Sequence, residues 1–141
     1  AGNISKRFSL SGIEIPRYGG ACPRWNVYSA FTTPGKLQAA VSKMSNGEKY
    51  VCIAKTVEKG VGRYGETKSM LSIGLGCEAK YAKEFVYTEN LNVNDKKTEI
   101  PIGVSCRTCD RLDCSQRAFP PLHKKFDVDI NTRGVSVYVS E

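Results

Sequence analysis

The sequence has no long hydrophobic run and few of the side chains on which enzymes usually rely. No segment approaches the ~20 apolar residues that a transmembrane helix needs, and the opening AGNISKRFSLSG lacks the apolar stretch of a signal peptide. The only histidine is His123, and no pair of carboxylates stands out as a catalytic acid and base. These absences predict a cytoplasmic protein that is not an enzyme and has no membrane partner.

The length of 141 residues predicts a single domain over 1–141. No internal repeat or low-complexity run divides it. Because the first residue is Ala1 rather than Met, we expect the domain to be a piece of a longer protein. The net charge of +7 favours an anionic partner only weakly, since charge balance bears mainly on solubility and steering.

Alternating hydrophobic residues predict more strands than helices. Strand patterns occur at 48–58 and 68–77, with a weaker one at 85–93, a strand or extended arm at 7–16 and a hairpin at 125–139. In 68–77 one face carries leucine and isoleucine, whereas the other carries glycine and serine, which suggests close approach by a backbone or a ligand. Short connections favour antiparallel pairing. We therefore expect an α+β domain with helices packed on one side of an antiparallel sheet, the layout of GAF and PAS sensor domains.

Two helices are expected. The stronger one begins at Pro34 and ends before Asn46-Gly47, because an apolar stripe repeats there with helical spacing and Thr33 suits an N-cap. The stripe consists of Leu37, Ala40, Val41 and Met44. A shorter helix is expected in EAKYAKEF, residues 78–85.

Three of the six cysteines lie in one segment, VSCRTCDRLDCSQRAFPPLHKK, residues 104–125. Cys106, Cys109 and Cys114 have the spacing C-x2-C-x4-C, which is typical of thiolates that hold a metal ion or an iron–sulfur cluster. A structural zinc site needs four ligands, and a second closely spaced pair is absent. An iron–sulfur cluster accepts three local ligands and one distant one.

The distant ligand is expected to be Cys77, because it ends a strand and strand ends carry functional groups. Cys22 and Cys52 are expected to be small buried hydrophobic residues, as free cysteines often are. Two alternatives remain open at this point: a zinc ion in place of the cluster, and a disulfide between Cys106 and Cys109.

Basic residues surround the cysteines, and a guanidinium binds phosphate through paired hydrogen bonds. We expect Arg117 and Lys124 to contact an anionic ligand from this segment. Arg24 and Trp25 would form a second arm, because an aromatic ring beside an arginine can stack on a nucleobase.

The motifs CRTCDRLDCSQRAFPP, GGACPRWNVYSAFTTPGK and IGLGCEAKYAKEFVY resemble the C-terminal domain of short-chain fatty-acyl-responsive bacterial transcription regulators. These regulators are of the XRE helix-turn-helix type and include regulators of propionate and glyoxylate-cycle genes. The resemblance implies a GAF-like sensor fold, short-chain acyl-CoA binding, and an iron–sulfur cluster, expected as 4Fe-4S, at Cys106, Cys109 and Cys114. It also implies that DNA is bound only through an N-terminal helix-turn-helix domain that this chain lacks.

Two functions from different classes follow. In the first, the chain is a sensor domain, and a candidate homodimer, whose ligand or cluster biases a two-state equilibrium passed to a DNA-binding domain. In the second, it is a zinc-stabilised nucleic-acid-binding module. The second is less favoured, because the basic residues form no continuous stripe with aromatic residues.

Overall fold

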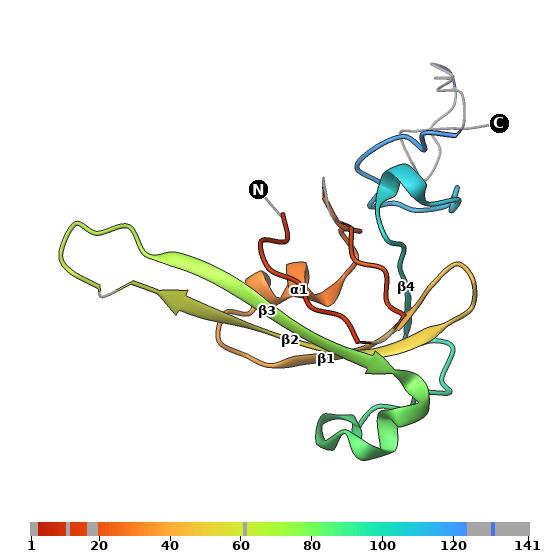
Figure 1. Cartoon of the computed structure of the whole chain (residues 1–141), viewed down its shortest axis with the longest axis horizontal. Helices are drawn as coiled ribbons and strands as arrows, with labels where there is room; N and C mark the ends of the chain where they lie inside the picture. The colour runs from red at the N-terminus through yellow and green to blue at the C-terminus, as the bar shows by residue number, and fades with distance from the viewer. Residues whose placement is uncertain (1–2, 11, 17–19, 61, 124–130, 132–141) are drawn as a thin grey trace.

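The computed structural model describes residues 3–10, 12–16, 20–60, 62–123 and 131. At its centre is a four-stranded sheet with the strand order β3-β2-β1-β4 (Figure 1). The strands are β1 (Gln38–Lys43), β2 (Lys49–Lys59), β3 (Ser69–Glu78) and β4 (Glu99–Pro101). The pairs β1–β2 and β2–β3 are antiparallel, but β4 runs parallel to β1. The α+β class is confirmed, and the expected antiparallel sheet is corrected to a mixed one.

The helices are short. They are α1 (Asn26–Ser29) and the 3-10 turns η1 (Ala30–Thr32), η2 (Ala79–Glu84), η3 (Val86–Thr88) and η4 (Cys106–Thr108). Within the described ranges none is long and apolar enough to cross a membrane. In segment 78–85, where a short helix was expected, the structure has the short 3-10 helix η2.

Small residues on one face of β3 let α1 pack against the sheet. A Cβ built on Gly74 would overlap the side chain of Val27 in α1, and one on Gly76 would lie 3.6 Å from Ile13 of the N-terminal arm. The close approach predicted from the sequence is thus made by a helix and an extended segment of the same chain.

The hydrophobic core is centred on strands β1 and β2. Val41 and Val51 are fully buried partners in the β1–β2 ladder, and Ile53 and Ala54 extend the buried surface along β2. At the far end of the sheet, Cys106 and Cys114 are also buried. The cysteine segment is therefore part of the packed interior.

The prediction of a helix that begins at Pro34 and ends before Asn46 is wrong, because residues 38–43 form strand β1. Asn46-Gly47 is the tip of the β1–β2 hairpin, not a helix end. The Gly47 backbone has a φ of 90°, and the Met44 N–H donates to the Glu48 carbonyl over 2.8 Å. The apolar spacing fits both periods over so short a segment, and pairing with β2 decides the outcome.

The predictions for 85–93 and 7–16 have different outcomes. Segment 85–93 contains η3 and turns where a strand was expected. For 7–16, expected as a strand or an extended arm, the described part has no strand and lies outside the sheet, which fits the arm. The hairpin expected at 125–139 lies almost wholly outside the described residues. In Figure 1 the β2–β3 hairpin projects to one side, and the cysteine segment lies beyond β4 at the other.

Candidate functional site: a four-cysteine pocket

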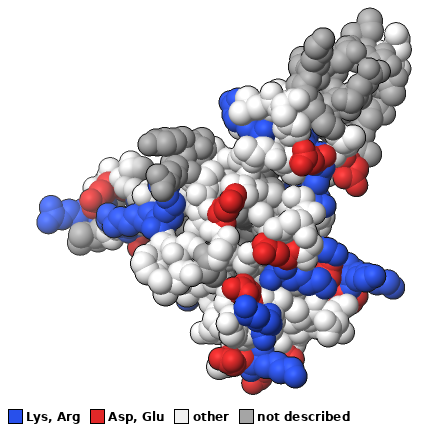
Figure 2. All heavy atoms as spheres, turned by 45° about the vertical axis from the view of Figure 1, so that its right-hand side comes forward, with Lys and Arg blue, Asp and Glu red and all other residues white. Residues whose placement is uncertain are grey.

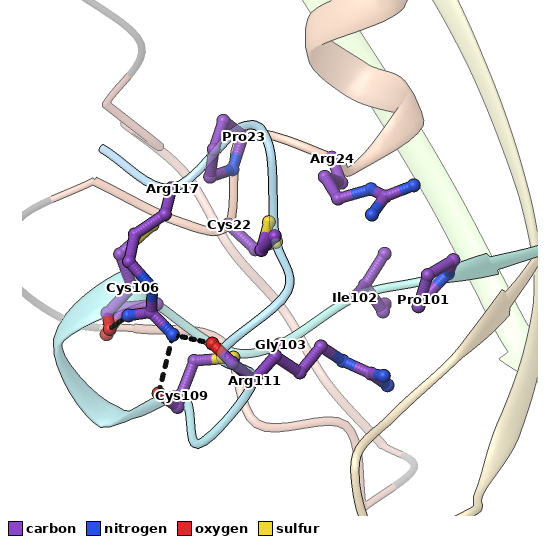
Figure 3. A pocket seen from close by; sticks show the side chains of 12 residues that line it. Cys22, Pro23, Arg24, Pro101, Ile102, Gly103, Cys106, Cys109, Arg111 and Arg117 are labelled. Atoms are coloured by element: carbon purple, nitrogen blue, oxygen red, sulfur yellow. Dashed lines mark hydrogen bonds between the residues drawn. The ribbon is translucent and has the colours of Figure 1, made fainter. Parts of the chain in front are cut away.

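Four cysteines line one pocket beyond the end of β4. Cys22 comes from the segment before α1, and Cys106, Cys109 and Cys114 come from the segment after β4 (Figure 3). Cys22, Cys106 and Cys114 are buried, and Cys109 is half-buried. The pocket therefore combines two chain segments that are far apart in the sequence.

Each of three turns begins at one of these cysteines. The carbonyl of Cys22 accepts the Trp25 N–H over 3.1 Å, that of Cys106 accepts the Cys109 N–H over 3.4 Å, and that of Cys114 accepts the Arg117 N–H over 3.3 Å. A tight turn of this kind places the cysteine side chain at a fixed angle to the loop that follows. The chain thus presents sulfur atoms from three similar turns.

Backbone N–H groups point at two of the sulfur atoms. The Ala118 N–H donates to Cys106 Sγ over 3.4 Å, and the backbone N–H groups of Arg24 and Gly103 donate to Cys22. Burial raises the pKa of the Cys22 thiol, the two N–H groups lower it, and the neighbouring Cys106 and Cys109 raise it again. Donors of this kind stabilise the charged form of sulfur once it is a ligand.

Gly103 joins the two segments. A Cβ on Gly103 would lie 3.1 Å from Cys109 Sγ, so only glycine leaves that sulfur its place. The Gly103 carbonyl accepts the indole N–H of Trp25 over 2.8 Å, and the adjacent Val104 carbonyl accepts the Cys22 N–H over 3.0 Å. These bonds fix Cys22 opposite the cysteine segment.

Arg117 holds the cysteine segment from inside. Its side chain is buried, and its guanidinium donates to the carbonyls of Cys106 at 2.9 Å and Cys109 at 3.0 Å (Figure 3). It also donates to the carbonyl of Phe119 at 3.3 Å. It donates to the Arg111 carbonyl as well. A planar fork of donors suits this task, because it can satisfy several carbonyls of a tight loop at once.

The structure brings together three of the four predicted sulfur ligands. Cys77 lies on β3 opposite Val51, away from the pocket, and Cys22 stands in its place. Sequence reasoning assigned Cys22 to the core, and it is buried, but it also lines the pocket. The signal that could have indicated this is its own turn, ACPRW, which begins with cysteine as CRTC does.

The four residues predicted to bind an anionic ligand have different places in the structure. Arg117 is committed to four carbonyls, so the structure assigns it a structural role in place of phosphate binding. Trp25 is half-buried and uses its indole N–H within the fold. Arg24 lines the pocket on the side of Pro101 and Ile102 (Figure 3). Lys124 lies outside the described residues.

The pocket that the four cysteines help to line has a cavity of about 10 Å³, room for roughly one water-sized species. Among the described side chains, no three His, Cys, Asp or Glu groups are close enough to ligate one metal ion. A zinc ion would draw the sulfurs inward to about 2.3 Å from the metal. The donor set, four sulfurs with backbone N–H donors, suits either centre.

His123 interacts with Asp110 through a contact of 2.7 Å between Nε2 and Oδ1, and both side chains are exposed. It lies outside the lining of the pocket. Figure 2 shows that on the viewed face the lysine and arginine side chains form separate groups with acidic side chains among them.

Comparison with known proteins places these features in a family. The profile of the family described as "Short-chain fatty acyl coenzyme A regulator, C-terminal" matches residues 1–138. The chain is 44% identical over 141 residues to the HTH-type transcriptional regulator RamB of Mycobacterium tuberculosis, covering 99% of the chain and 30% of that protein. It is 42% identical over 138 residues to the propionyl-CoA carboxylase regulator of Cereibacter sphaeroides, covering 98% of the chain and 30% of that protein.

A solved structure described as a Mycobacterium tuberculosis transcriptional regulator has the same fold, with a TM-score of 0.85 and 38% identity. The match covers 95% of this chain and 41% of that one. The chain therefore spans about three-tenths of the length of the curated relatives that it matches.

Proposed function

Because the chain belongs to the short-chain fatty acyl coenzyme A regulators, whose C-terminal domain it forms, we propose that it is the sensor domain of a bacterial transcription regulator. A helix-turn-helix domain elsewhere in the regulator would bind DNA, and this domain would respond to a small ligand or to redox state. A ligand can shift such an equilibrium only by binding one state better than the other. The observation that carries the proposal is the four-cysteine pocket within a chain of this family.

We further propose that the pocket holds an inorganic centre through Cys22, Cys106, Cys109 and Cys114. The family resemblance supports an iron–sulfur cluster. Four thiolates leave such a cluster with net negative charge, and the buried guanidinium of Arg117 and the N–H groups directed at Cys22 and Cys106 would offset that charge. When bound, a cluster supplies reversible one-electron chemistry.

A zinc ion is the second candidate, and the small cavity is the observation that favours it. The room for one water-sized species matches the size of a single ion, and the sulfur atoms would move inward to bind it. In that case the centre would be purely structural and would stabilise the fold at this end of the sheet.

Metal analysis after anaerobic purification tests both candidates. Iron together with acid-labile sulfide would support the iron–sulfur cluster, and zinc without sulfide would support the zinc ion instead. We expect both Cys22→Ser and Cys106→Ser to lose most of the bound metal, and we expect the control Cys77→Ser to retain it. Loss in Cys77→Ser together with full retention in Cys22→Ser would return the fourth-ligand role to Cys77.

The second part of the proposal is binding of a short-chain acyl-CoA. Coenzyme A carries a pyrophosphate and a 3′-phosphate, so it needs several cationic side chains. Arg24 remains a candidate from the described residues, and Lys124 remains one from the sequence. Loss of one charge-assisted contact is worth about 1.5–3 kcal/mol, or roughly tenfold or more in affinity.

Calorimetry with propionyl-CoA tests this part on the wild type, Arg24→Ala and Lys124→Ala. The matched control is Arg63→Ala, in the exposed loop between β2 and β3. We expect the first two variants to bind about tenfold more weakly and the control to bind like the wild type. Undetectable binding to the metal-loaded wild type would reject the ligand. A normal affinity in both variants would keep the ligand but reject these residues.

A further inference from the structure

Strand β3 forms one edge of the described sheet, and its own sequence carries little of the usual protection of an edge. Among the described residues, β2 is its sole strand neighbour. From Met70 to Cys77 the strand contains no charged residue and no proline. Natural sheets usually blunt a long edge with lysine, proline or a bulge, because its free N–H and C=O groups can pair with another chain.

The same strand carries an open apolar face. Leu71, Ile73 and Leu75 are 44%, 53% and 61% exposed, and they lie on the side opposite to Gly74 and Gly76, which α1 and the N-terminal arm cover. Val57, the β2 partner of Leu71, is also exposed on this side. Lys55 of β2 borders the patch beside Ile73.

We propose that β3 pairs with β3 of a second copy of this chain, antiparallel and centred on Ile73. The pattern of the strand is complementary to itself in this register. Ile73 would face its own counterpart, and Leu71 would face Leu75 of the second copy on both sides of the two-fold axis. Such apolar cross-strand pairs stabilise a sheet, and a symmetric dimer uses the same patch twice.

The opposite face of β3 fits the same register. There Ser72 would oppose Gly74 of the second copy, and Met70 would oppose Gly76. No two large side chains meet on that face, where α1 already lies close to the sheet. The pairing would give a continuous eight-stranded sheet, two of the four-stranded units side by side.

Charge at the two ends of β3 selects this register. Lys68 immediately precedes the strand and Glu78 ends it, so in the register centred on Ile73 they lie directly opposite each other at both ends. Within one copy Lys68 contacts Glu58 at 3.4 Å and Glu78 contacts Lys80 at 2.6 Å. All four side chains are more than one-third exposed, so these surface pairs hold them only weakly and can extend into a network across the dimer.

A disulfide tests both the pairing and its register. In the proposed dimer residue 69 faces Cys77 of the second copy, so Ser69→Cys should give a covalent dimer under mild oxidation, linked from 69 to 77 in peptide mass spectra. Within one copy these positions lie about 26 Å apart along the strand, so the link can form only between copies. The matched control Thr67→Cys lies two residues earlier, before β3 begins, and should give no link to Cys77.

Sedimentation of the 141-residue chain measures the association itself. We expect a concentration-dependent dimer, and we expect Ile73→Lys to reduce its association at least tenfold, because two like charges would meet on the axis. Val86→Lys, at an exposed apolar site outside β3, is the control and should dimerise like the wild type. Lys68→Glu should weaken association roughly two- to tenfold, and adding Glu78→Lys in the same chain should restore it.

A wild-type chain that stays monomeric at several hundred micromolar and yields no 69–77 link would overturn the proposal. The β3 edge would then be assigned to another part of the regulator. A dimer that forms equally well in Ile73→Lys would overturn it too, since association would then use a different surface. A 67–77 link without a 69–77 link would reject the register centred on Ile73.

Discussion

Replacement of Arg117 by methionine should loosen the whole cysteine segment. Methionine keeps much of the apolar stem but removes the guanidinium, which donates to the carbonyls of Cys106, Cys109, Arg111 and Phe119. The side chain is 8% exposed, so water reaches these carbonyls poorly in the folded state. The variant leaves four acceptors to find new partners.

The expected loss is about 3–5 kcal/mol of unfolding free energy. One hydrogen bond from a charged group contributes about 1.5–3 kcal/mol, so a simple sum over four bonds would be larger. The loops after β4 can relax and admit water, which replaces part of the lost hydrogen bonding. The expected loss of unfolding free energy is therefore close to the cost of breaking a buried charged interaction. Arg117→Lys should lie between the wild type and Arg117→Met, because an ammonium has three donors but no planar fork.

Urea unfolding followed by tryptophan fluorescence measures this effect locally. Trp25 is the only tryptophan, and its indole N–H bonds to Gly103 beside the pocket. The control is Arg107→Met: Arg107 is exposed and lies 4.6 Å from the centre of the Phe119 ring, so its loss should cost roughly 0.5–1 kcal/mol. Equal stabilities for Arg117→Met and Arg107→Met would refute the assignment of Arg117 as the internal support.

Three further predictions concern the sheet and the joint to the pocket. Gly74→Ala should destabilise the domain by about 1–3 kcal/mol in urea unfolding, because the new methyl group overlaps Val27, and adding Val27→Ala should recover part of the loss; no recovery would contradict the contact. Gly103→Ala should lower the bound metal per chain without unfolding the sheet, because its Cβ would displace Cys109; unchanged metal content with normal circular dichroism would contradict this. Hydrogen bonds from Lys49 and Lys43 lower the pKa of Glu99 on β4, so its contribution to stability is present above the ordinary carboxyl pKa and is lost as pH falls through the lowered one. Acid unfolding followed by Trp25 fluorescence should therefore be less steep in Glu99→Gln, and identical acid profiles would argue against the ion pairs.

Sequence patterns located β2 and β3 correctly because both are long and alternate over many residues. Their apolar positions, such as Val51 and Ile53 in β2, pair with positions of the same face in the neighbouring strand. The segment before β2 was misassigned because Leu37, Ala40 and Val41 fit a helical stripe as well as a strand over so few residues. Cross-strand pairing with β2, a non-local interaction, decided between them.

The cysteine segment was recognisable from composition and spacing alone. Cys106, Cys109 and Cys114 lie so close together in the chain that any fold must keep them near one another. The turns that begin at these cysteines are local features as well, since they form from hydrogen bonds between residues three positions apart. Local spacing therefore identified three of the four sulfurs of the pocket.

Tertiary structure alone decided which distant residues join them. Cys22 and Cys77 are both isolated in the sequence, and only the packing of α1 and of segment 102–104 brings Cys22 to the pocket. The sequence predicted Arg117 as a ligand of phosphate, whereas in the structure its guanidinium donates hydrogen bonds to backbone carbonyls. Likewise, periodicity placed leucine and isoleucine on one face of β3, but only the structure shows that this face is exposed at the edge of the described sheet. Periodicity reports which side chains share a face, whereas burial of that face depends on what the rest of the chain, or a second chain, places against it.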